Sequence, residues 1–109
     1  MRIITKRSIT ECWNRYPDSK PSLAIWEERM YMADCRNHEE LKKIFSTADY
    51  IPNPYFKHLT LFNIKGNDYR LGVDIFFNTG HIFLKWFGKH SEYDNINFTK
   101  LSNEGFRLC

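Results

Sequence analysis

The sequence predicts an α+β domain in which two or three helices pack on one face of an antiparallel β-meander. Apolar residues recur at helical spacing in the first half of the chain, and apolar and polar residues alternate in the second half. Ile51-Pro52-Asn53-Pro54 separates the two halves. With 109 residues the chain has the length of one domain, so residues 1–109 are expected to form a single unit around one core.

The chain is expected to open with a short strand over residues 2–5, followed by an amphipathic helix. Ser8 and Glu11 have the spacing of a capping box, which predicts that the helix starts at Ser8 and runs up to Pro17. Its apolar positions follow at i, i+3, i+4 and i+7, and they are Ile9, Cys12, Trp13 and Tyr16.

Two further helices are predicted before the Pro-rich segment. Asp18 or Ser19 is expected to cap the first of them, and Pro21 is tolerated because it falls in the first turn. Asn37 is expected to cap the second. The apolar faces are Leu23, Trp26, Met30 and Ala33 in the first, and Leu41, Ile44 and Phe45 in the second.

The second half is expected to be a meander of three strands. Turns at Gly66-Asn67 and Asn78-Thr79-Gly80 separate extended segments over residues 57–64, 69–77 and 81–87. In the central segment Leu71, Val73 and Ile75 alternate with Arg70, Gly72 and Asp74. In the last, Ile82, Leu84 and Trp86 alternate with Phe83, Lys85 and Phe87.

This alternation predicts one covered face and one open face. Leu71, Val73, Ile75 and Leu84 are expected to be buried beneath Ile9, Trp13, Leu23 and Trp26. Arg70 and Lys85 then lie together on the open face, which becomes a cationic surface with exposed aromatic rings. A slip of one residue would reverse this assignment.

Composition excludes several classes of protein. No segment approaches the roughly 20 apolar residues of a membrane span, and the first residues do not resemble a signal peptide, so a cytoplasmic protein without a membrane partner is expected. The histidines and cysteines show no metal-ligand spacing, so no metal or cofactor is expected. The net charge of +3 permits a polyanionic partner without demanding one.

The segment after the last strand carries the residues that point to chemistry. If Gly88-Lys89-His90-Ser91-Glu92-Tyr93-Asp94 starts a helical turn, His90, Tyr93 and Asp94 share one face. Two proton-transfer groups and a carboxylate would then meet beside Arg70 and Lys85. A metal-free ribonuclease needs this combination of proton acceptor, proton donor and cations around a phosphate.

The order of elements and two motifs resemble a known family. The motifs are F-N-I-x-G-N-x-Y-R-L, from Phe62 to Leu71, and F-G-x-H-x-x-Y-D, from Phe87 to Asp94. With them, the chain resembles the HigB toxins of the RelE superfamily over about residues 2–96. The resemblance implies a ribosome-dependent mRNA interferase of a type II toxin-antitoxin module. It also implies a HigA-like antitoxin with a helix-turn-helix fold, through which alone the toxin would meet DNA.

Carried onto matching positions, the resemblance implies catalytic roles for Arg70, Lys85, His90 and Tyr93 and a contact to RNA for Asp94. Lys57 and Lys89 are further candidate cations, and Phe87 is a candidate ring for stacking on a base. The family often has Arg at the place of Lys85 and Thr at that of Lys89. Lysine lacks the bidentate fork that arginine presents to phosphate.

Structural readings compete with these roles. Arg70 would form only a surface ion pair if it met Asp74 along the strand, His90 would act as a helix cap or partner of Asp94, and Tyr93 would pack on Phe87. The protein would then be a non-catalytic RNA-binding or protein-interaction module that uses the same basic, aromatic sheet face.

Overall fold

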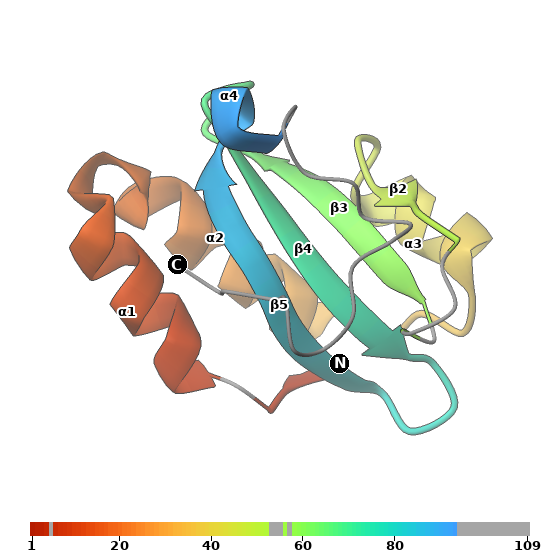
Figure 1. Ribbon diagram of the computed structural model, residues 1–109. Coiled ribbons are helices and arrows are strands. Elements are labelled where there is room, and N and C mark those ends of the chain that lie inside the picture. The colour runs from red at the N-terminus through yellow and green to blue at the C-terminus, as the bar shows by residue number, and fades with distance from the viewer. Residues whose placement is uncertain (5, 53–55, 57, 94–109) are drawn as a thin grey trace.

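The computed structural model describes residues 1–4, 6–52, 56 and 58–93, and these residues form a five-stranded sheet with helices around it (Figure 1). The helices are α1 (Lys6–Arg15), α2 (Lys20–Met32), α3 (His38–Ile44) and α4 (His90–Tyr93), with a 3₁₀ turn, η1 (Pro17–Ser19), before α2. The strands are β1 (Arg2–Ile3), β2 (Asp49–Tyr50), β3 (Leu59–Ile64), β4 (Tyr69–Phe76) and β5 (His81–Lys89). The predicted α+β class is confirmed.

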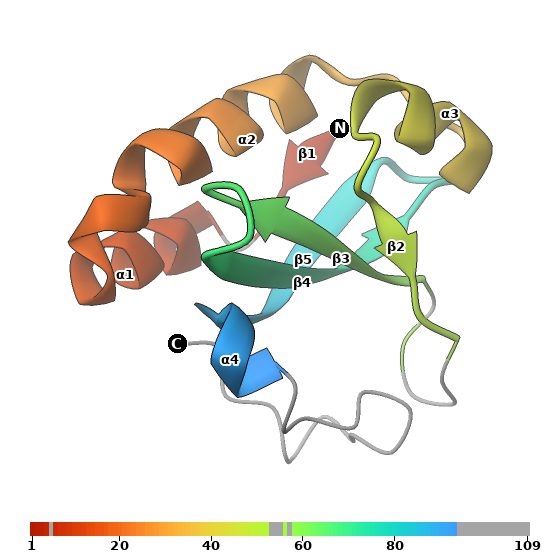
Figure 2. The ribbon, with the colours of Figure 1, turned by 90° about the horizontal axis from the view of Figure 1, so that it is seen from above.

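The sheet order is β1-β5-β4-β3-β2. β3, β4 and β5 are antiparallel neighbours, as predicted for the meander. β2, which was not predicted, pairs antiparallel with β3, and β1 pairs with β5 in parallel. Gly66 (φ 63°) and Gly80 (φ 74°) occupy left-handed positions in the two turns, where a side chain would be strained. Figure 2 shows α1, α2 and α3 on one side of the sheet and α4 on the other.

The predicted helix caps are partly wrong. α1 begins at Lys6, so Ser8 lies inside the helix and forms no capping box; an added half-turn at Lys6 and Arg7 costs little, since both residue types favour helix. Ser19 precedes α2, but its hydroxyl donates to the Tyr16 carbonyl oxygen (2.6 Å) because the chain enters α2 through the 3₁₀ turn. Asn37 caps α3 as predicted, and its Oδ1 accepts from the Glu40 N–H (2.9 Å).

The main core lies between the sheet and the helices α1 to α3. Leu71, Val73, Ile75 and Leu84 are buried there together with Ile9, Leu23 and Trp26, and Trp13 is partly buried against them. This confirms the covered face predicted for β4. Burying each of these large side chains contributes roughly 1.5 to 3 kcal/mol, so the core holds the sheet firmly against the helices.

A β-bulge at Lys85 changes the faces of the last strand. Gly72 pairs with Trp86, but the next residue, Val73, pairs with Leu84, so Lys85 has no direct partner on β4. One extra residue reverses the alternation beyond it. The predicted faces of Trp86 and Phe87 are therefore wrong, because Phe87 joins the main core and Trp86 lies on the opposite face.

The face opposite the helices is not the open cationic surface predicted. Its centre is a second apolar cluster of Phe56, Leu59, Leu61 and Trp86, all buried. Glycine at position 88 makes room for this cluster, because a Cβ there would stand 2.8 Å from the Trp86 ring atom Cζ2. The centre of this face is therefore apolar, with Lys85 beside the cluster.

Candidate active site

Arg70 and His90 meet at the end of the sheet where β4 begins and β5 ends. Arg70 pairs across the strands with Gly88, and α4 starts directly after β5 with His90 as its first residue. Arg70 Nη2 lies 3.3 Å from His90 Nε2. Guanidinium nitrogens only donate, so Nε2 is the acceptor in this contact and the ring proton of a neutral His90 lies on Nδ1.

The backbone of His90 is held by a second contact. Its N–H donates to the Asp68 carbonyl oxygen (3.0 Å) in the turn before β4. The predicted helical start at His90 is thus confirmed, and α4 is tied to the same strand end that carries Arg70. The imidazole and the guanidinium are therefore positioned by the sheet rather than by a free loop.

The alternative reading of Arg70 as a partner of Asp74 is wrong in the described part of the chain. The Asp74 carboxylate is buried and its Oδ1 accepts a hydrogen bond from the His58 N–H (2.8 Å) at the other end of β4. Arg70 instead contacts the His90 ring, at the end of the sheet where β4 begins.

The other predicted site residues are placed less closely. Lys85 lies on the face opposite the helices, with Nζ 5.4 Å from the Phe56 ring centroid and 5.8 Å from that of Phe83. Its contacts are therefore with aromatic faces rather than with Arg70 or His90. Tyr93 ends α4, three residues after His90. The Tyr93 side chain, Lys57 and Asp94 lie outside the described part.

The expectation of an exposed Phe87 ring is wrong. Phe87 is 2% exposed, stacks on Tyr69 with ring centroids 5.4 Å apart, and meets Tyr16 edge-on at 5.7 Å. The bulge at Lys85 is the cause, since it turns Phe87 toward the helices. The ring presents no surface on which a base could stack.

A polar groove of about 370 Å³ adjoins His90. Lys89, predicted to contact RNA, is exposed at its edge. The groove runs between the 3₁₀ turn, the β3–β4 turn and the start of α4. The residues that line it are Asp18, Asn67, Asp68, Tyr69, Lys89, His90 and Ser91.

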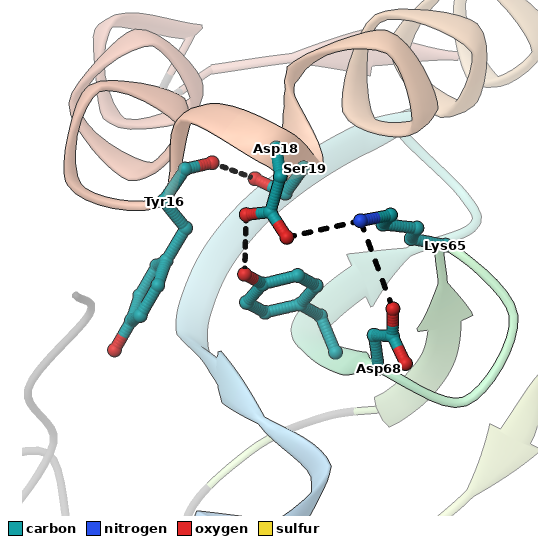
Figure 3. Close-up of polar contacts among 6 residues, drawn as sticks. Tyr16, Asp18, Ser19, Lys65 and Asp68 are labelled. Carbon is teal, nitrogen blue, oxygen red and sulfur yellow. Dashed lines mark hydrogen bonds and ion pairs between the residues drawn. The ribbon is translucent and has the colours of Figure 1, made fainter.

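One wall of this groove is a hydrogen-bonded network that the sequence does not reveal (Figure 3). The Tyr69 hydroxyl donates to Asp18 Oδ1 (2.5 Å), and Lys65 Nζ lies 3.0 Å from Asp18 Oδ2 and 3.8 Å from Asp68 Oδ2. The hydrogen bond from Tyr69, followed by that from Lys65, lowers the pKa of Asp18. The bond to Asp18 and burial raise the pKa of Tyr69 to about 12.

Replacing Tyr69 with phenylalanine is expected to lower the free energy of unfolding at neutral pH, because Asp18 loses its main stabilising donor. A carboxyl whose folded pKa is depressed stabilises above its unfolded pKa. The difference in unfolding free energy between the parent and Tyr69→Phe should therefore shrink as the pH falls below 3.8, the ordinary pKa of an aspartate carboxyl. Urea unfolding of both proteins at several pH values measures this difference.

The control is Tyr31→Phe, because Tyr31 is 71% exposed. It should match the parent at every pH. A Tyr69→Phe variant whose unfolding free energy equals that of the parent at neutral pH would show that the network does not stabilise the groove wall.

Two histidines that are far apart in sequence come together at the other end of the sheet. The rings of His38 and His58 lie 5.5 Å apart within a cluster that also contains Tyr50 and Phe77. Burial, followed by the nearby charge of His58, lowers the pKa of His38. Within residues 1–4, 6–52, 56 and 58–93, no three histidine, cysteine or acidic side chains gather to hold a metal ion.

Comparison with known proteins gives matches over most of the chain. A family model described as HigB toxin, RelE-like toxic component of a toxin-antitoxin system, matches residues 19–96. The mRNA interferase toxin HigB of Escherichia coli K12 is 27% identical over 97 residues, which cover 86% of this chain and 88% of that protein. The mRNA interferase HigB of Shigella flexneri shows the same identity and coverage.

Proposed function

Because the chain belongs to the HigB toxin family, the RelE-like toxic components of toxin-antitoxin systems, we propose that it is an mRNA interferase that cleaves messages on the ribosome. Relatives that are 27% identical over most of their length carry the name mRNA interferase. The observation that carries the proposal is the contact between Arg70 and His90, which joins a fixed cation to a proton-transfer group at an accessible strand end.

The proposed reaction is attack of a ribose 2′-hydroxyl on the adjacent phosphate. It needs a base for the hydroxyl, positive charge for the dianionic phosphorus and an acid for the 5′-oxygen. As the acceptor from Arg70, His90 Nε2 offers the lone pair that is proposed to take a proton once Arg70 releases it. Arg70 meets the charge that develops on phosphate, and Tyr93 is the proposed second proton-transfer group.

The remaining predicted residues are proposed to bind RNA around this pair. Lys89 is exposed beside the groove at His90, and Lys85 lies on the same sheet face as Arg70, so both are proposed to contact phosphates. Lys57 is proposed to add charge to the same path, and Asp94 to orient His90 or a lysine. These roles stay predictions.

The family implies an antitoxin as partner and RNA as target. More specifically, we propose a HigA-like antitoxin with a helix-turn-helix fold, through which the toxin contacts DNA only indirectly, and the ribosome as the platform for cleavage in the cytoplasm. In the described residues no helix has the length and apolarity to cross a bilayer. The proposed site contains few catalytic groups, so it would depend on the ribosome to hold the codon in line for attack.

Induction of this chain without an antitoxin is expected to arrest bacterial growth and to cut messages that are being translated. Primer extension on a reporter message before and after induction locates the cuts, and the same message without ribosomes should be cut slowly or not at all. The matched control is the chain with Arg70→Ala and His90→Ala together, expressed to the same soluble level. Growth arrest with intact messages would favour the non-catalytic binding module instead.

A further inference from the structure

Asn63 is a polar residue beside Arg70 that the proposed chemistry has not yet used. It lies on β3 directly opposite Arg70 of β4, so both side chains are on the same face of the sheet. Its Nδ2 donates to Asn67 Oδ1 (3.3 Å), while its Oδ1 is buried and has no hydrogen-bond partner among the described residues. An unsatisfied buried acceptor costs free energy, so its presence calls for a reason.

The contact between Arg70 and His90 suggests that reason. While Arg70 Nη2 donates to His90 Nε2, the lone pair that would accept a proton from the substrate is occupied. The guanidinium is held by the ring and not by a phosphate. During the reaction Arg70 must therefore leave His90 and take a new position, and something else must then orient it.

We propose that Asn63 is a positioning residue for Arg70, an inference that rests on the ribonuclease function proposed above. When the scissile phosphate takes the place of His90, Asn63 Oδ1 accepts a hydrogen bond from the guanidinium. Side chains directly opposite on antiparallel strands start only about 5 Å apart at Cβ, so the two groups are within reach. The guanidinium has five donors, which leaves a fork for the phosphate after one bond to Asn63.

A neutral amide suits this task better than a carboxylate. An aspartate opposite Arg70 would pair with it as an ion and compete with the phosphate for its charge. The Asn63 carbonyl accepts a hydrogen bond and leaves the full positive charge of Arg70 for the transition state. The Asn63 oxygen is then unsatisfied in the free protein and gains its hydrogen bond only when the substrate is bound.

The test is single-turnover cleavage on programmed ribosomes with Asn63→Ala and Asn63→Leu. Both should lower the cleavage rate at saturating toxin by about 10- to 100-fold, the range for a misplaced catalytic group. The toxin concentration that gives half of the maximal rate should change little. Asn63→Leu removes an unsatisfied acceptor and nearly keeps the volume, so its melting temperature should equal or exceed that of the parent. Asn14→Ala, an exposed asparagine on α1, is the control and should cleave like the parent.

A double-mutant cycle separates positioning from a merely structural role. In the Arg70→Ala background, Asn63→Leu should cause no further loss, because the residue it positions is gone. Equal losses in both backgrounds, or parental cleavage by Asn63→Leu, would overturn the inference while leaving the proposed function intact. If the parent itself does not cleave messages on ribosomes, the proposed function fails and the inference fails with it.

Discussion

Arg70→Ala is expected to lower single-turnover cleavage on programmed ribosomes by about 10² to 10³, the range for loss of one preorganised donor at a developing charge. Arg70 is partly exposed at the start of β4 and held opposite Gly88, so its charge is placed by the sheet. Its removal takes away the cation that contacts His90. The folded structure should persist, because the core residues that flank Arg70 on β4 are unchanged.

Arg70→Lys should recover only part of this loss, since the charge returns without the planar fork that binds two phosphate oxygens. The matched control is Arg7→Ala, because Arg7 is exposed on α1, on the helical side of the sheet. Melting temperatures are measured alongside. If Arg70→Ala cleaves at the parental rate, or fails only because it unfolds, Arg70 has no catalytic role.

His90→Ala is expected to reduce the chemical step by roughly 10² or more, as for a lost general acid or base. His90 is partly exposed and its ring contact is with Arg70, so stability should change little. The pH dependence of the rate should also change, because the variant lacks one of the two groups proposed to exchange protons with the substrate. Added imidazole should restore part of the rate.

His81→Ala is the matched control, since His81 lies at the opposite end of β5. Tyr93→Phe, measured in the same reactions, should lose about as much as His90→Ala if both groups transfer protons. Binding of each variant to the ribosome should stay at the parental level. A His90→Ala variant with an unchanged cleavage rate and pH profile would show that His90 is not a catalytic residue.

Local signals in the sequence were sufficient for the class of fold and for the two faces of β4. Alternation along β4 placed Leu71 under the helices and Arg70 on the other face, because successive side chains of a strand point to opposite faces. Asn37 was recognised as a cap from its place before two acidic residues. The sequence offered a helical turn after the last strand as the condition for grouping His90 with Tyr93, and α4 does begin at His90.

Only the tertiary structure decided the faces of β5 beyond Lys85 and the hydrogen-bonded wall of the groove beside His90. The bulge at Lys85 depends on how Trp86 packs against Gly88 on one face and Phe87 against Tyr69 on the other, and no local pattern records such packing. Sequence alternation assumes an unbroken ladder, so it misplaced every side chain beyond the bulge.

The same limit applies to pairs of residues that are distant along the chain. Asp18 and Tyr69 are 51 positions apart, and Asn63 meets Arg70 only through the register of β3 and β4. The sequence by itself determined the class of fold, the strand that carries Arg70 and the position of His90, since these depend on neighbours in the chain. Long-range packing decided which polar groups surround Arg70 and His90, because side chains from different elements come into contact only once the core has set the distance between those elements.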